Sequence, residues 1–87
     1  MANPVTVSCS LNAWTKVATN VQIGNVWILS TNPTEYLHTY RLTAQAAPTD
    51  KSEGALFTRN GIGINSSVGI DVYIYPTVTA GLVRVDV

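Results

Sequence analysis

The sequence predicts an all-β fold, which we expect to be a small antiparallel β-sandwich formed by residues 1–87 as a single domain. Short runs of valine, threonine and aromatic residues alternate with polar positions, as half-buried strands do. Turn residues separate these runs at regular intervals, and no segment keeps a helical period over three turns. Short, regularly spaced strands are typical of sandwiches and small barrels. We favour the sandwich, of which the jelly roll is one form.

Eight segments carry the strand pattern: residues 4–10, 13–18, 25–31, 36–44, 55–59, 62–64, 70–75 and 82–87. In the fourth, Tyr36, His38, Tyr40 and Leu42 share the face that we expect to point to the core. In the last, we expect Val83, Val85 and Val87 to point to the core. The longest break, residues 45–54, is rich in loop residues and charge, and we expect one helical turn at 50–53 that Gly54 ends.

The sequence indicates three places where strands are interrupted. Gly24-Asn25 is a turn signal, and residues 65–69 are polar enough to form a loop. Asn60-Gly61 lies between two β-prone runs, which is the strongest short-range signal for a hairpin. We therefore expect residues 55–59 and 62–64 to pair with each other.

Two segments suggest an interaction surface. Residues 25–31 are apolar on both faces, with Val26 and Ile28 opposite Trp27 and Leu29, so this strand is buried on both sides or docked to a partner on one. In residues 70–75, the apolar face leaves Tyr73 and Tyr75 pointing away from the core. These tyrosines are either exposed, as a sugar-stacking platform or interface anchor, or covered by the opposite sheet. The candidate interface residues are Trp14, Trp27, Tyr73 and Tyr75.

The composition points to contacts with proteins. Charged residues make up 11% of the chain, against roughly 25% in ordinary domains. The centres of protein interfaces are similarly poor in charge, although strands also favour uncharged threonine and valine. The net charge is zero and no basic run is present, so nucleic-acid binding is not expected. A domain of 87 residues has a small stability margin, which association with other chains would increase.

The sequence indicates neither catalysis nor a bound metal or cofactor. His38 is the only histidine and Cys9 the only cysteine, whereas metal ligands occur in clusters. The nucleophile motif G-x-S-x-G is missing, so we expect a protein that is not an enzyme. Cys9 is either a small buried residue or the site of a disulfide between copies. The start, Met1-Ala2-Asn3-Pro4, has no signal-peptide pattern, and no run of residues is apolar enough to span a membrane.

Four stretches are similar to segments of small virion proteins of tailed bacteriophages. They are Trp14-Thr15-Lys16-Val17-Ala18, residues 47–54 (Ala-Pro-Thr-Asp-Lys-Ser-Glu-Gly), Ile70-Asp71-Val72-Tyr73-Ile74-Tyr75 and Gly81-Leu82-Val83-Arg84-Val85-Asp86. The resemblance extends over most of the chain. It implies an all-β structural component of the virion, of the capsid decoration (cement) type or a head-tail accessory, and it brings no catalytic residues.

Two functions follow as expectations. The first is a capsid decoration protein that binds the major capsid protein or other virion proteins. It would be made in the cytoplasm of the bacterial host, located in the virion, and assembled as a homo-oligomer, with a trimer favoured. The alternative is a carbohydrate- or receptor-binding module of a tail fibre or spike, because exposed tyrosine and tryptophan side chains can stack on sugars.

Overall fold

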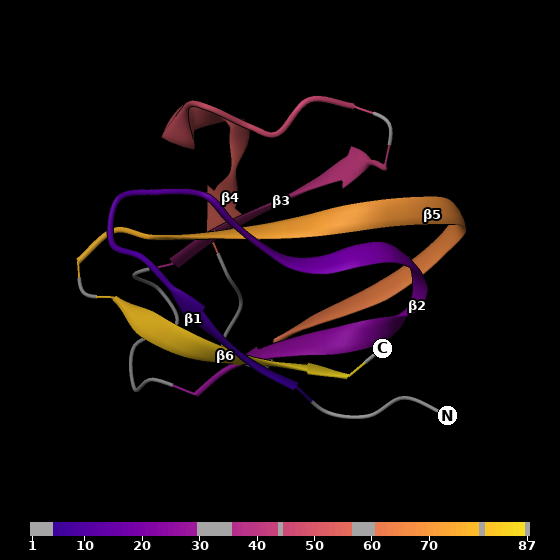
Figure 1. The fold of residues 1–87 in the computed structure, drawn as a ribbon, viewed down its shortest axis with the longest axis horizontal. Helices are drawn as coiled ribbons and strands as arrows, with labels where there is room; N and C mark the ends of the chain where they lie inside the picture. Colours follow the sequence, from indigo (N-terminus) through magenta and orange to yellow (C-terminus); the bar gives the residue numbers. More distant parts are fainter. Residues whose placement is uncertain (1–4, 30–35, 44, 57–60, 79, 87) are drawn as a thin grey trace.

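The computed structural model describes residues 5–29, 36–43, 45–56, 61–78 and 80–86. They form one antiparallel sheet of six strands in the order β1-β6-β2-β5-β3-β4 (Figure 1). The strands are β1 (Val5–Cys9), β2 (Thr15–Ile28), β3 (Tyr36–Leu42), β4 (Ala55–Leu56), β5 (Ile62–Pro76) and β6 (Gly81–Asp86). A single 3-10 turn, η2 (Lys51–Glu53), precedes β4. The all-β, antiparallel prediction is confirmed.

The sandwich arises because this one sheet folds over on itself. The long strands β2 and β5 pair along most of their length and bend together, and from the bend two arms run back toward the same end of the molecule (Figure 1). The pairing is irregular between Lys16 and Ile23, and Asn20 within this stretch has a φ of 53°. Such bulges bend a strand and increase its twist. The layers are therefore two halves of one sheet, and not the separate sheets of a jelly roll.

The arms contain different strands. In the first arm, β3 pairs with the C-terminal half of β5, and the two-residue β4 pairs with β3 at the edge. In the second arm, β6 pairs with the C-terminal half of β2, and β1 pairs with β6 at the opposite edge of the sheet. We call these the β3 arm and the β6 arm.

The core lies between the arms. It is made almost entirely of aliphatic side chains from both, and its buried members are Cys9, Val17, Ala18, Val21, Val26, Tyr36, Ile62, Ile64, Val72, Ile74, Val83 and Val85. The predicted inward positions Val83 and Val85 are confirmed, and Val87 lies outside the described residues. In β3, Tyr36 is buried on the core side as expected, whereas Tyr40 and Leu42 are exposed because they lie toward the end of the arm at the bend.

Three local predictions are wrong. Gly24-Asn25 lies inside β2, and residues 65–69 lie inside β5, so four predicted strands merge into two long ones. Among the described residues β4 pairs only with β3, so the expected hairpin around Asn60-Gly61 does not form between β4 and β5. Asn60 itself lies outside the described residues. In each case cross-strand pairing with a distant segment outweighs the local preference for a turn.

Candidate binding surface

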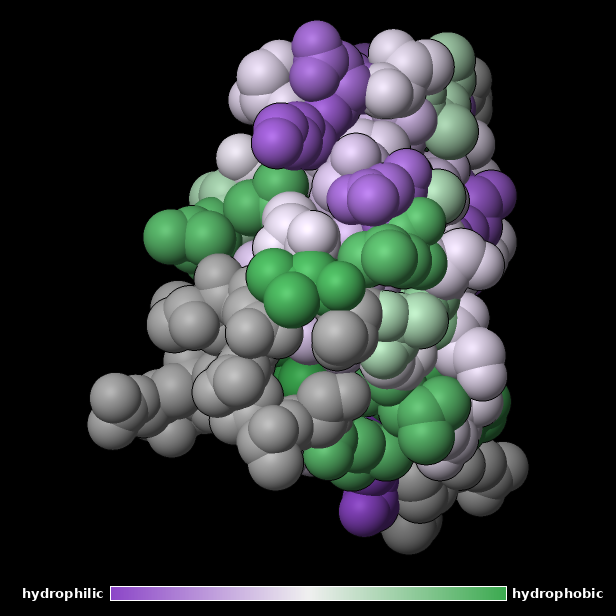
Figure 2. Space-filling model, turned by 90° about the vertical axis from the view of Figure 1, so that its left-hand side faces the viewer, coloured by the Kyte–Doolittle hydropathy of each residue, from purple (hydrophilic) through white to green (hydrophobic). Residues whose placement is uncertain are grey.

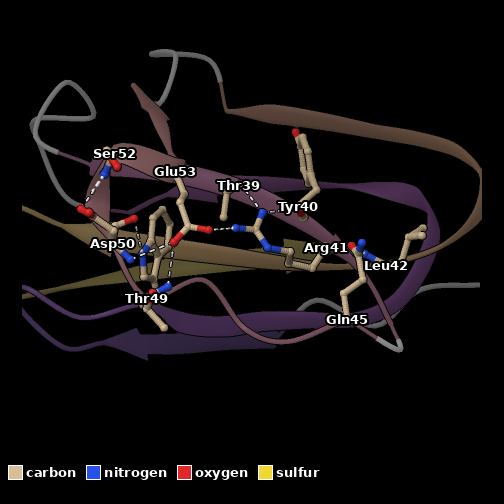
Figure 3. Close-up of polar contacts among 10 residues, drawn as sticks. Thr39, Tyr40, Arg41, Leu42, Gln45, Thr49, Asp50, Ser52 and Glu53 are labelled. Atoms are coloured by element: carbon tan, nitrogen blue, oxygen red, sulfur yellow. Dashed lines mark hydrogen bonds and ion pairs between the residues drawn. The ribbon is translucent and has the colours of Figure 1, made fainter.

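The outer face of the β3 arm is covered by the chain itself. The segment from Gln45 to Gly54 is held by the Glu53 carboxylate, which accepts hydrogen bonds from the backbone N–H groups of Thr49 (3.0 Å) and Asp50 (2.9 Å) and forms an ion pair with Arg41 of β3 (Figure 3). These backbone hydrogen bonds, followed by Arg41, lower the pKa of Glu53. The segment is thus fastened to the sheet beneath it.

The helical turn in this segment follows the prediction. Asp50 caps η2 by accepting a hydrogen bond from the N–H of Ser52 (3.1 Å), and Gly54 ends the turn. The indole Nε1 of Trp14 donates to the Asp50 carbonyl (3.2 Å). The Trp14 ring lies so close to Gly54 that a Cβ at this glycine would be 2.5 Å from Cη2. Sequence reasoning missed this cover, although the D-x-x-E capping signature at 50–53 was a signal for it.

Asp71 is the buried charged group under the cover, with 1% of its surface exposed. It accepts hydrogen bonds from the backbone N–H of Asn20 (2.9 Å) and the hydroxyl of Thr43 (3.2 Å), and it forms an ion pair with Lys16 (3.3 Å). The Asn20 hydrogen bond is the main cause of the lowered pKa of Asp71, and Lys16 adds to it. Asp71 thereby ties the bulge of β2 to the end of β3, which is a structural role.

Three of the four predicted interface residues belong to this covered face. Tyr73 is 4% exposed and Lys16 lies over its ring, with Nζ 5.9 Å from the ring centre. Trp14 and Tyr75 are half-buried and pack edge to face, with their ring centres 5.2 Å apart. The expectation that Tyr73 is exposed is therefore wrong. The other alternative, that the tyrosines are covered, holds for Tyr73, although Lys16 of β2, and not an opposite sheet, lies over its ring. Tyr75 is only half-buried.

Trp27, the fourth, lies on the outer face of the β6 arm, which no described segment covers. Cross-strand pairing places Trp27 opposite Arg84, whose guanidinium lies 5.7 Å from the centre of the indole ring. Arg84 also pairs with Asp86 at 3.9 Å, so the charges on this face balance locally. We call this surface the open face, and its members are Thr6, Ser8, Ile23, Asn25, Trp27, Leu29, Gly63, Leu82, Arg84 and Asp86.

The open face combines neutral polar side chains with exposed aliphatic ones. Ile23 is 74% exposed, and Leu29 and Leu82 are also exposed. Leu29 and Leu82 lie near the end of the molecule opposite the bend, where Leu11 and Val78 are exposed as well. Figure 2 views this end and shows hydrophobic residues gathered across its middle and lower part, with hydrophilic residues at the top. Apolar side chains gathered on the end of the molecule next to Leu29 and Leu82 make this part of the surface a candidate interaction site.

The remaining chemistry-bearing groups are part of the packing. His38 lies on the core side of β3, and burial lowers its pKa. The described residues contain no group of three or more histidine, cysteine or acidic side chains able to hold a metal ion. No helix within the described ranges is long and apolar enough to cross a membrane.

Cys9 is 2% exposed in the core, and burial raises its pKa to about 11. Because the thiolate is the reactive species, we expect native Cys9 to react with a disulfide reagent at pH 8 about 100-fold more slowly than the urea-unfolded chain. We also expect no disulfide between copies, so the chain runs as a monomer on a non-reducing denaturing gel. A native protein that gave a reducible dimer band would contradict this prediction.

Comparison of the chain with protein-family models, with curated proteins and with solved structures gives no significant match in any of the three. The function is therefore argued from the open face itself.

Proposed function

We propose that the chain is a non-enzymatic structural protein of a bacteriophage virion, a capsid decoration (cement) protein that binds the major capsid protein through the open face. The observation that carries the proposal is the asymmetry between the two outer faces. A charged segment covers the β3 arm, whereas on the β6 arm the half-buried Trp27 lies among exposed aliphatic and small neutral side chains that no described segment covers. Tryptophan and arginine at the centre of an apolar patch are typical anchors of protein interfaces.

The low charge of the whole chain supports this role. Neutral polar groups cost less to bury than unpaired charges, so a charge-poor surface suits permanent contact with other proteins. The open face keeps one cation and one anion, Arg84 and Asp86, and these already neutralise each other. The resemblance to phage virion proteins agrees with this reading and supplies the kind of assembly. We place the chain in the virion after synthesis in the host cytoplasm.

Cosedimentation with capsids of the phage that encodes the chain tests the proposal. We expect the wild-type protein to pellet with capsids and Trp27→Ala to bind at least about tenfold more weakly, since an aromatic anchor contributes more than 1 kcal/mol. Ile23→Lys is the second variant, because Ile23 is so exposed that its replacement leaves the fold intact. Leu56→Ala, an exposed aliphatic residue at the far edge of the sheet, is the matched control and should bind like wild type. Equal binding of all four proteins would refute a role for the open face.

The alternative function is a carbohydrate- or receptor-binding module of a tail fibre or spike. Its supporting observation is that Trp27 lies beside Gly61, which places no side chain next to the indole. Arg84 already lies over the indole, which favours a protein partner over a stacked sugar. Binding on a glycan array that Trp27→Ala removes would favour this alternative. Tyr73 is too deeply buried to serve with Tyr75 as the platform.

A further inference from the structure

The two edges of the sheet differ in how they are protected. An edge strand exposes unpaired backbone groups that can pair with another chain, and proteins usually block it with charge, proline, a bulge or a short strand. β1 and the β3–β4 side are the two edges here. Whether each is blocked decides how this chain can associate with itself.

The β3–β4 edge is blocked. β4 has only two residues. Beyond it, the backbone N–H of Leu42 donates to the side chain of Gln45 (2.9 Å), and the Leu42 carbonyl accepts from the Gln45 N–H (2.9 Å). Arg41 donates to the carbonyl of Tyr40 (2.9 Å), so side chains satisfy the backbone where β4 does not reach (Figure 3). A strand from another copy cannot add at this edge.

The β1 edge is open. Within the described part of the chain, Val5–Cys9 pairs with β6 and makes no other backbone hydrogen bond. The strand contains no charged residue, no proline and no bulge. Val5 faces the core side of the sheet, opposite buried Val85, yet is 53% exposed because β1 is the edge strand of the described sheet. The hydrophobic core is thus incomplete at this edge.

We propose that β1 pairs antiparallel with β1 of a second copy about a two-fold axis at Val7, which joins two sheets into one. A blocked edge and an open edge cannot pair head to tail, so the contact joins identical edges and is closed and symmetric. Full overlap of the five residues places Val7 opposite its own copy, Thr6 opposite Ser8 and Val5 opposite Cys9. Apolar residues then meet on the core side, and hydroxyl side chains meet on the outside, a favourable cross-strand pair.

This inference goes beyond the proposed function and does not depend on it. It gives a dimer, where the resemblance led us to expect a trimer. Thr6 and Ser8 belong to the open face, so pairing at β1 joins the open faces of the two copies into one continuous surface. A partner that binds the open face would then meet two copies of Trp27.

Light scattering after size exclusion, over a range of concentrations, tests the pairing. We expect wild type to reach twice the chain mass of 9.3 kDa at high concentration. Thr6→Glu/Ser8→Glu places like charges directly opposite each other twice across the two-fold axis. We expect it to raise the dimer dissociation constant at least about tenfold, and high salt to reverse part of this effect. Glu at position 6 also faces Arg84 within the chain, so the fold should be unharmed, as circular dichroism will show.

The matched variant is Thr6→Glu/Ser8→Lys, which places opposite charges across the same axis. We expect it to bring the dissociation constant back to within about threefold of wild type. The proposal is overturned if wild type stays monomeric at millimolar concentration, if it forms a trimer, or if both double variants dimerise equally well. Capsid cosedimentation is measured separately. A monomer that binds capsids would refute the β1 pairing alone, and a dimer that does not bind capsids would refute the decoration role alone.

Discussion

Replacement of Asp71 by alanine is expected to lower the free energy of unfolding by about 2 kcal/mol, because it removes the charged, buried acceptor of two part-buried hydrogen bonds. The donors are the N–H of Asn20 in the β2 bulge and the hydroxyl of Thr43, and Lys16 loses its ion pair. Urea unfolding followed by tryptophan fluorescence at pH 7 measures the change. Asp86→Ala is the control, since this half-exposed acid makes only a surface ion pair and should change stability by about 0.5 kcal/mol or less.

Asp71 also predicts how stability depends on pH. Its folded-state pKa is lowered, mainly by the Asn20 hydrogen bond, so the unfolded chain takes up a proton before the folded chain does. The stabilisation is complete above the ordinary carboxyl pKa of about 4 and is lost as pH falls through the lower folded value. As the pH is lowered from about 5 into the acid range, the free energy of unfolding of Asp71→Asn should therefore fall less than that of wild type. Part of the remaining slope belongs to Glu53, whose pKa is also lowered. If the free energy of unfolding fell equally with pH in wild type and Asp71→Asn, this role of Asp71 would be contradicted.

Gly61→Ala is expected to destabilise the fold by about 2–3 kcal/mol and to disturb the open face. Gly61 has a φ of 84°, where residues with a Cβ are strained. A Cβ there would lie 2.5 Å from the Val26 carbonyl oxygen and 2.7 Å from Cδ1 of Trp27. The contact with the indole is relieved by displacing the Trp27 ring, whereas the contact with the Val26 carbonyl oxygen persists as strain, because that oxygen cannot move without disturbing β2. Urea unfolding and the tryptophan emission spectrum should both change.

Gly63 provides the matched control on the same strand. It has an ordinary strand conformation, and a Cβ there would have only Asn25 Oδ1 nearby, at 3.7 Å. Gly63→Ala should stabilise the fold by about 0.5 kcal/mol, because alanine restricts the unfolded chain more than glycine does. If both substitutions had the same effect on stability, the special conformation of Gly61 would not be the cause.

The sequence could predict features that depend on near neighbours. The alternation of Val83 and Val85 gave the buried face of β6, and Asp50 with Glu53 and Gly54 marked the short helical turn. Both are decided within one strand or one turn, by the pleat in the first case and by end capping in the second.

Features that depend on distant partners could not be predicted. Gly24-Asn25 and the polar run at 65–69 look like turns, but β2 and β5 pair across them and the chain continues as strand. The alternation of Asp71, Tyr73 and Tyr75 identified a shared face without showing what lies over it. That cover depends on the ion pair between Arg41 and Glu53 and on Trp14 meeting Gly54, contacts that join segments far apart in the chain.

The bend in the β2–β5 pair also has a mechanical consequence. In a sandwich of separate sheets, a force that pulls the layers apart is resisted mainly by side-chain packing. Here β2 and β5 each pass through both arms, so at the bend the same load acts along two covalent backbones and the hydrogen bonds between them (Figure 1). At the opposite end the arms are joined by connecting segments, such as the one between β1 and β2, and, among the described residues, not by paired strands. We therefore expect the layers to stay together at the bend and to separate first at the opposite end.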